Sequence, residues 1–452
     1  MNKIEFGDCR EIMKRWIDEG VKINTCITSP PYYGLRDYGT ATWEGGDINC
    51  DHKNAKMKSR YDYPMQEGSR HAKIAETTKG TDGAKWHDEC PDCNAIKKDN
   101  QIGLEQTPKE YIENMVDVFN HVKELLADDG TLWVNIGDSY SSHKDCKSIG
   151  QTLAKGTNRE NAHVMDLGKS RVRDTKMLKS QGLKNKDLIG IPWMLAFALR
   201  EAGWYLRQDI IWHKPNPMPE SVTDRCTKSH EYIFLLSKSP QYYFDHVAIK
   251  EPSVNPESYK GRRKRSSMTE QSEIIMDKFG ATRSGFKNIE EGKTYPTRNK
   301  RDVWSVNVRP YKGAHFATYP TALIEPCILA GTSEKGHCPV CNARWKRMKI
   351  DTGERHDVEV YTGKAIKDYE HAKAQNPSDT KRRVLESMSK IYKYEWIPTC
   401  ECRLEPVPDI VFDPFMGSGT TAQVALQHGR QYLGCELNKE YEKLQQERIG
   451  NG

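Results

Sequence analysis

The chain has 452 residues, with 69 Lys and Arg against 63 Asp and Glu, and a formal net charge of +6. No apolar run approaches the ~18 residues that a membrane span needs, and the opening MNKIEFGDCREI lacks a signal-peptide core. Both features argue against a membrane protein and a secreted disulfide-rich protein, so we expect a cytoplasmic protein whose 13 cysteines are reduced or bind metal.

Residues 1–40 are expected to form a strand, a helix over REIMKRWID, a strand over INTCITS and then a loop. Asp8 follows the first strand, where it could cap the helix or face a ligand. The loop begins with Ser29, Pro30, Pro31 and Tyr32. The two prolines fix φ and donate no hydrogen bond, so the carbonyls beside them are held outward, and Tyr32 adds a flat stacking face. These residues predict a clamp for a planar base that carries an exocyclic amine.

Residues 41–100 are polar and predict an insertion. After it, apolar positions at helical spacing predict a helix that ends at Asp129-Gly130, followed by a strand over TLWVNIGD; the positions are Tyr111, Met115, Val118, Phe119 and Val122. Residues 142–186 lack this periodicity and hold eleven Lys or Arg against four acids. That charge fits contact with DNA phosphates or a solvated loop.

Order is expected to return with a helix over IPWMLAFALREAGW and strands over LRQDIIWHK and EYIFLLSK, which complete a catalytic segment over 101–252. Residues 253–301 have no apolar periodicity and hold twelve Lys or Arg against six acids. Their densest basic run is Arg262, Arg263, Lys264 and Arg265. We expect this run to contact DNA phosphates. The catalytic domain resumes over 302–337, and residues 338–405 form a second insertion.

Residues 406–452 have the pattern of a nucleotide site: the strand DIVFD, a turn with Gly417 and Gly419, a helix that opens at Thr420, and the strand QYLGCELN with Glu436. A glycine turn lets backbone N–H groups approach a ligand, and the acid can accept hydrogen bonds from ribose hydroxyls. Strands that alternate with helices in both halves predict a doubly wound α/β sheet, with ligands at the carboxyl ends of its strands.

Two groups of cysteines have the spacing of metal ligands. The first is Cys50, His52, Cys90 and Cys93, with His87 as an alternative to His52, and the second is Cys338, Cys341, Cys400 and Cys402. Four such ligands suit tetrahedral zinc, so we expect one or two zinc ions; the alternative is isolated reduced thiols. Isolated thiols are what we expect at the remaining positions: Cys9, Cys26, Cys146, Cys226, Cys327 and Cys435.

The order of the two motifs resembles that of the S-adenosylmethionine-dependent DNA amino-methyltransferases, which methylate N4 of cytosine or N6 of adenine. In that family the (S/D/N)PP(Y/F) tetrapeptide is catalytic and an FxGxG loop binds the cofactor. The catalytic motif comes first here, as in the β group, which keeps target recognition between its two halves. The intermediate segments GLEQTPKEYIENMVDVF, ADDGTLWVNIGDSY, GWYLRQDIIWHKPNPMPESV, HEYIFLLSKS and HFATYPTALIEPCILAGT extend the resemblance over most of the chain.

The resemblance implies a mostly parallel seven-stranded sheet with one reversed strand, and it implies residue roles. Asp8 would bind the adenine amine of the cofactor and Glu436 its ribose. The methionine moiety would be surrounded by Phe412, Asp413, Phe415, Gly417, Gly419 and Thr420. The Ser29 hydroxyl and the Pro30 carbonyl would accept the hydrogens of the target amine, while the flipped base stacks on Tyr32.

The serine before the prolines resembles the cytosine-N4 enzymes, and adenine-N6 methylation is the alternative. A catalytically silent DNA-binding protein is a third interpretation, although such a protein would not need both halves of a transfer site. The expected partners are double-stranded DNA and a cognate restriction endonuclease, with the protein a monomer or homodimer.

Overall fold

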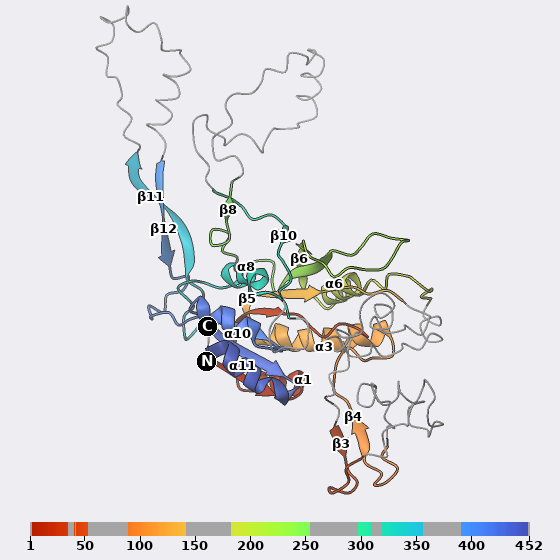
Figure 1. The fold of residues 1–452 in the computed structure, drawn as a ribbon. Coiled ribbons are helices and arrows are strands. Elements are labelled where there is room, and N and C mark those ends of the chain that lie inside the picture. Colours follow the sequence, from red (N-terminus) through yellow and green to blue (C-terminus); the bar gives the residue numbers. More distant parts are fainter. Residues whose placement is uncertain are drawn as a thin grey trace, which may run out of the picture. The chain divides into compact units, whose positions relative to one another are not determined.

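The computed structural model describes residues 2–34, 40, 42–52, 89–141, 182–253, 297–309, 318–355 and 390–450 (Figure 1). Its helices are α1 (Cys9–Asp18), α3 (Pro108–Leu125), α6 (Ile191–Glu201), α8 (Thr321–Gly331), α10 (Thr420–Gln427), the 3-10 helix η3 (Lys439–Tyr441) and α11 (Glu442–Gly450). Its strands are β1 (Asn2–Phe6), β2 (Ile23–Thr28), β3 (Thr42–Glu44), β4 (Ile96–Lys98), β5 (Leu126–Ile136), β6 (Tyr205–His213), β7 (His230–Ser237), β8 (Glu251–Pro252), β9 (Thr297–Arg298), β10 (Val303–Ser305), β11 (Lys346–Arg355), β12 (Lys390–Ile397), β13 (Ile410–Asp413) and β14 (Gln431–Glu436).

These residues fall into two compact units. The first contains Met1–Phe244, Asp302–Glu334 and Pro408–Gly452 and holds the large sheet, the helices and the hairpin β3–β4. The second contains Asp245–Arg301 and Lys335–Val407 and holds the antiparallel pairs β8–β9 and β11–β12. The long strands β11 and β12 run side by side in Figure 1.

The large sheet has the strand order β1-β14-β13-β2-β5-β7-β6-β10. β7 is antiparallel to both of its neighbours, and the other neighbouring pairs are parallel. The expected α/β class and the single reversed strand are therefore confirmed. β13 lies beside β2, with Val411 opposite Thr25 and Phe412 opposite Cys26. This pairing brings the carboxyl ends of two strands from opposite ends of the chain to one edge of the sheet.

The expected number of strands was wrong, because the described sheet has eight and not seven. The additional strand, β10, is only three residues long and pairs with β6. It is held by the buried Trp304 and by the Trp212 indole N–H, which donates to the Val306 carbonyl at 2.8 Å. So short a strand has too few residues to display the alternation by which strands are recognised in a sequence.

Side chains of β2 and β5 alternate between two buried faces, as expected for a sheet that is covered on both sides. Cys26, Leu132 and Val134 belong to the core formed with α1, α3 and α6. Thr25 and Thr131 face α8, where a Cβ on Gly331 would lie only 2.8 and 3.0 Å from their hydroxyl oxygens. The result is a three-layer α/β arrangement around the strands that end at the site.

Local signals account for the start of α3, and strand pairing accounts for its end. Thr107 and Glu110 form a reciprocal capping box, and Pro108 occupies the first turn, where its missing N–H has no cost. The helix ends at Leu125, earlier than the Asp129-Gly130 end that we expected, because the next residue, Leu126, already has extended backbone angles and begins β5. Strand pairing with β2 determines this boundary.

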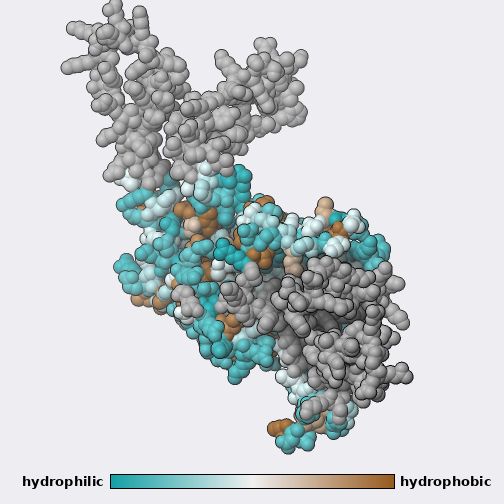
Figure 2. Space-filling model, in the orientation of Figure 1, coloured by the Kyte–Doolittle hydropathy of each residue, from teal (hydrophilic) through white to brown (hydrophobic). Residues whose placement is uncertain are grey.

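On the face drawn in Figure 2, the described residues are mainly hydrophilic, with small hydrophobic areas among them. Among the described helices, none is both long and apolar enough to cross a membrane.

Candidate functional site

The proline-rich loop begins directly after β2 and is braced by the first turn of α3 and the segment before it. The Tyr111 hydroxyl donates to the Pro31 carbonyl at 2.9 Å, and the Gly34 N–H donates to the Gly103 carbonyl at 2.7 Å. The Tyr33 hydroxyl donates to the Gln106 carbonyl at 3.1 Å. The Pro31 carbonyl is thus occupied by a hydrogen bond from Tyr111. These contacts fix the backbone of the loop that carries Ser29 and the Pro30 carbonyl.

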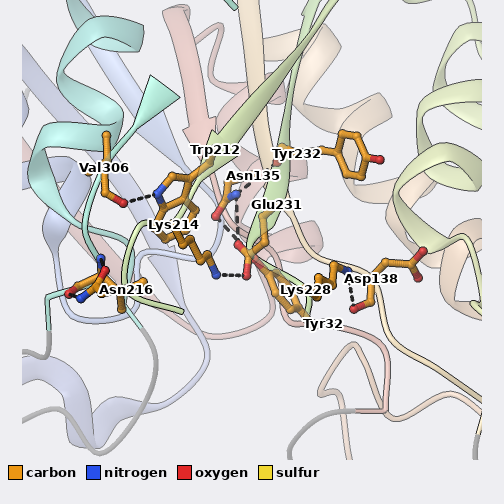
Figure 3. A network of polar contacts seen from close by, with 11 residues as sticks. Tyr32, Asn135, Asp138, Trp212, Lys214, Asn216, Lys228, Glu231, Tyr232 and Val306 are labelled. Atoms are coloured by element: carbon orange, nitrogen blue, oxygen red, sulfur yellow. Dashed lines mark hydrogen bonds and ion pairs between the residues drawn. The ribbon is translucent and has the colours of Figure 1, made fainter. Parts of the chain in front are cut away.

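Tyr32 lies in a polar network built from the ends of three further strands (Figure 3). Its hydroxyl donates to Glu231 Oε2 at 2.8 Å, and Lys214 forms an ion pair with the other carboxylate oxygen. Asn135 Nδ2 lies 3.4 Å from the same Oε2 and donates to the Tyr232 carbonyl at 3.1 Å. Burial, reinforced by the Glu231 charge, raises the pKa of the Tyr32 phenol well above its usual value, so the ring carries a neutral hydroxyl.

A glycine makes room for this network. A Cβ on Gly137 would lie 2.8 Å from Tyr32 Cε2 and 3.3 Å from the Glu231 side chain. A larger residue would therefore displace the ring. Sequence reasoning missed Asn135, Gly137, Lys214 and Glu231. All four lie in segments that carry the family resemblance, but only the strand order shows that they surround Tyr32.

The glycine turn connects β13 to α10 and contacts the expected acid. Gly417 and Gly419 have φ of +53° and +84°, a region that L side chains rarely adopt. The Gly417 N–H donates to Glu436 Oε2 at 2.7 Å, and the Asn438 N–H donates to Oε1 at 2.8 Å. Burial raises the pKa of the Glu436 carboxyl to about 7. Its charge state therefore changes near neutral pH.

Asp413 ties the two motifs together. Its carboxylate is fully buried and accepts from the Thr28 hydroxyl at 2.6 Å, the Thr421 hydroxyl at 2.6 Å and the Tyr319 hydroxyl at 2.9 Å. The Phe415 N–H donates to the same carboxylate at 3.0 Å. Because Thr28 immediately precedes Ser29, this one side chain connects the loop after β2 to the turn after β13.

The other expected cofactor residues take different positions. The Phe412 ring is fully buried and packs edge-on against Trp16 at 6.1 Å, so its side chain belongs to the core. Phe415 is partly buried beside that core, and Thr420 begins α10. Asp8 caps α1 through the Arg10 N–H at 2.9 Å and forms an ion pair with the Arg10 guanidinium at 2.6 Å. Burial alone would raise the pKa of Asp8, but the Arg10 hydrogen bonds outweigh it and lower the pKa.

Asp8 nevertheless lies at the same edge of the sheet as the acid after the glycine turn. Phe6 is opposite Glu436 in the β1–β14 pair, and the Gly7 N–H donates to the Glu436 carbonyl at 2.9 Å.

Both cysteine groups come together in space. In each group, one ligand atom from every residue lies within 4.8 Å of the others; the groups are Cys50, His52, Cys90 and Cys93, and Cys338, Cys341, Cys400 and Cys402. The alternative ligand His87 lies outside the described residues, as does Cys146. Of the isolated cysteines, Cys226 is exposed, and the rest of those described are buried and form no disulfide: Cys9, Cys26, Cys327 and Cys435.

The expected DNA contacts Arg262, Arg263, Lys264 and Arg265 lie outside the described residues, as does most of the basic segment 142–186.

Comparison with known proteins identifies the family. A sequence model for N6 and N4 DNA methylases matches residues 23–338 and 340–447. The chain belongs to this DNA methylase family. It is therefore a DNA methyltransferase, and the resemblance drawn from its motifs is confirmed.

Two relatives of this DNA methyltransferase match nearly its whole length. The type II methyltransferase M.SmaI of Serratia marcescens is 32% identical over 447 residues, which cover 99% of this chain and 90% of the relative. M.Cfr9I of Citrobacter freundii, also a type II methyltransferase, is 31% identical over 435 residues, which cover 96% and 83%. A solved structure, the cytosine-N4-specific PvuII DNA methyltransferase, aligns with 13% identity over 99% of this chain and 86% of that chain, at a TM-score of 0.43.

Proposed function

We propose that this DNA methyltransferase transfers a methyl group from S-adenosylmethionine to N4 of a cytosine that is flipped out of duplex DNA. The observation that carries the proposal is the bond between Thr28 and Asp413, which joins the serine-proline loop to the glycine turn. A group held by the turn and a base held by the loop would share one edge of the sheet, as transfer between them requires.

The residues around the turn fit an adenosine with a charged tail. Gly417 and Gly419 leave the turn without side chains, and Glu436 offers carboxylate oxygens beside it. We assign the ribose to Glu436 and the adenine amine to Asp8, whose bonds to Arg10 would have to rearrange for this contact. We assign to Asp413 a bracing role beside the cofactor, because its oxygens already accept from protein donors.

The loop residues can make the exocyclic amine of the base more nucleophilic. The lone pair of N4 is delocalised into the ring, so the nitrogen becomes a nucleophile only when its N–H bonds are directed. The Ser29 hydroxyl and the Pro30 carbonyl accept those hydrogens, and Tyr32 supplies the stacking face for the flipped base. Bound S-adenosylmethionine supplies an electrophilic methyl group on a sulfonium. The new N–C bond forms as the S–C bond breaks, S-adenosylhomocysteine leaves, and the amine then loses one proton to water.

Cytosine is favoured over adenine because serine precedes the two prolines. Adenine-N6 methylation is the alternative, and a single experiment distinguishes them. DNA methylated with isotope-labelled cofactor is digested to nucleosides, and labelled N4-methylcytosine is expected. Labelled N6-methyladenine would show that adenine is the target base. Unlabelled DNA at saturating cofactor would support a catalytically silent DNA-binding protein.

Two variants test whether the loop carries the reaction. Pro31→Ala and Tyr32→Ala are expected nearly to abolish transfer while cofactor affinity stays close to normal, since both residues hold the base. Wild-type turnover of either variant at saturating DNA would remove the loop from the active site.

The DNA partner is assigned to the basic segments. We propose that residues 253–301, with Arg262 to Arg265, form the target recognition region and that 142–186 adds phosphate contacts. A site-specific methyltransferase of this kind would protect DNA from a cognate restriction endonuclease. Loss of salt-dependent DNA binding when all four basic residues of 262–265 are replaced by glutamine is the expected result, and unchanged binding would contradict the assignment.

A further inference from the structure

The two cysteine groups share a six-residue turn that occurs twice in the chain. The turns are Cys90-Pro-Asp-Cys-Asn-Ala95 in the first unit and Cys338-Pro-Val-Cys-Asn-Ala343 in the second. In each turn the first cysteine N–H donates to the alanine carbonyl, at 2.8 and 2.9 Å, and the asparagine N–H donates to the first cysteine carbonyl, at 2.8 and 3.0 Å. Both asparagines have φ of +59°, an uncommon conformation for a residue other than glycine.

The distances within each group fit a tetrahedral metal. Cys50 Sγ and Cys90 Sγ are 3.9 Å apart, Cys93 Sγ and His52 Nδ1 are 3.6 Å apart, and Cys341 Sγ and Cys402 Sγ are 3.7 Å apart. Zn–S bonds of about 2.3 Å place tetrahedral sulfur ligands about 3.8 Å apart. A disulfide would need about 2.05 Å. We propose that each group binds one zinc ion, through three thiolates and one imidazole in the first unit and through four thiolates in the second.

Among the described residues, those around the first site form almost no core. Around the antiparallel pair β3–β4, the buried cluster of described residues is Cys90 and Ala95, with Trp43, Cys50 and Cys93 packed against it. The Trp43 ring stacks on the His52 ring at 4.7 Å. So small a cluster cannot fold a segment by hydrophobic burial, and zinc supplies that free energy. In this proposal zinc therefore folds the described part of the insertion, around β3 and β4.

Zinc content tests the proposal directly. Reduced protein purified without chelators is expected to contain two zinc ions per chain by elemental analysis. Cys93→Ser and Cys341→Ser should each lose one, whereas Cys226→Ser, an exposed cysteine outside both groups, should keep two. Wild-type protein without zinc would overturn both sites, and one zinc per chain would overturn the site whose variant leaves the content unchanged.

A second measurement covers variants that fail to fold. Wild-type protein reconstituted with cadmium-113 is expected to give two resonances, the more deshielded from four sulfur ligands and the other from three sulfurs and one nitrogen. A single resonance would contradict the assignment, as would two resonances at the chemical shifts of cadmium bound by oxygen ligands alone.

An independent observation concerns Glu231, whose two carboxylate oxygens serve different partners. Oε1 pairs with Lys214, and Oε2 accepts from the Tyr32 hydroxyl at 2.8 Å (Figure 3). Lys214 is fixed in turn, because its ammonium lies 4.3 Å from the centre of the Trp212 ring. The Lys214 and Glu231 side chains are only 19% and 15% exposed, so solvent competes weakly for this ion pair.

We infer that Glu231, held by Lys214, is a positioning residue that sets the angle of the Tyr32 ring for the flipped base. The inference rests on the proposed function, in which the base stacks on that ring. Stacking depends on the orientation of the ring. The hydrogen bond from the Tyr32 hydroxyl to Glu231 fixes that orientation relative to strands β6 and β7.

Two conservative variants and their combination test this role. Tyr32→Phe keeps the aromatic ring and removes the hydroxyl that bonds to Glu231. Glu231→Gln keeps a hydrogen-bond acceptor but removes the charge that pairs with Lys214. Each is expected to lower the single-turnover rate roughly tenfold or more, with cofactor affinity unchanged. The double variant should be no slower than the slower single variant, because both act through one bond.

Additive losses, or wild-type rates for Tyr32→Phe, would overturn the positioning role. A wild-type protein that methylates no DNA would instead overturn the proposed function. The fluorescence of 2-aminopurine at the target position adds a readout of flipping: both variants should still flip the base, since they alter ring angle and leave DNA contacts intact.

Discussion

The raised pKa of Glu436 predicts that adenosine binding depends on pH near neutrality. The carboxylate accepts the Gly417 and Asn438 N–H groups and, in the proposed site, the ribose hydroxyls as well. Its pKa of about 7 reflects burial, which disfavours the charged form. With that pKa, about nine-tenths of the side chain is ionised at pH 8 and about one-tenth at pH 6. Affinity should therefore be about tenfold weaker at pH 6 than at pH 8 if the carboxylate is the binding form.

The assay is calorimetry with 5′-methylthioadenosine, which keeps the ribose but lacks the titrating amino acid of the full cofactor. Glu436→Gln should bind more weakly at pH 8 and lose the pH dependence, while Glu440→Gln, at an exposed position four residues away, should keep it. Equal affinity of the wild-type protein at both pH values, or the same pH dependence in Glu436→Gln, would refute the reasoning.

The raised pKa of Glu436 also predicts how the free energy of unfolding changes with pH. A folded pKa of about 7, above the ordinary 4.5, means that the folded protein holds more protons than the unfolded chain between these values. Without ligand, the contribution of Glu436 to stability is therefore present below pH 4.5 and lost as the pH rises to 7, a change of about 3 kcal/mol. Urea unfolding of the ligand-free protein at several pH values should show this loss for the wild type and not for Glu436→Gln.

Three further variants probe the site. Gly137→Ala places a Cβ 2.8 Å from Tyr32 Cε2, so the unfolding free energy should fall by about 1–3 kcal/mol and turnover should drop; Gly450→Ala, with no atom within 4 Å, is the control in the same urea titrations. Asp413→Asn points an N–H donor at buried hydroxyls, so the free energy of unfolding, measured by thermal unfolding, should fall by about 3 kcal/mol. An unchanged free energy of unfolding would contradict the bracing role of Asp413. Gly417→Val forces a β-branched residue to a φ of +53°, so calorimetry should find cofactor affinity reduced about tenfold or more; a normal affinity would contradict the assigned turn.

Features that depend on neighbours along the chain could be inferred from residue type and order alone. The prolines after β2, the glycines before α10 and the CPxC turns each act through local backbone geometry, so their chemistry could be inferred from residue type and spacing. Apolar periodicity likewise located α3, because a helix that buries one face displays that face in its sequence.

The contacts between residues that are distant along the chain could not be inferred in this way. Glu231 and Lys214 surround Tyr32 because β7 runs antiparallel between β5 and β6, and nothing local in either strand encodes that order. Phe412 and Asp413 were expected at the cofactor, yet one packs into the core and the other bonds Thr28, since side chains alternate along β13 and the register of the β13–β2 pair determines what each one faces. Contacts between distant residues follow from strand order and register, and these are properties of the whole packed sheet.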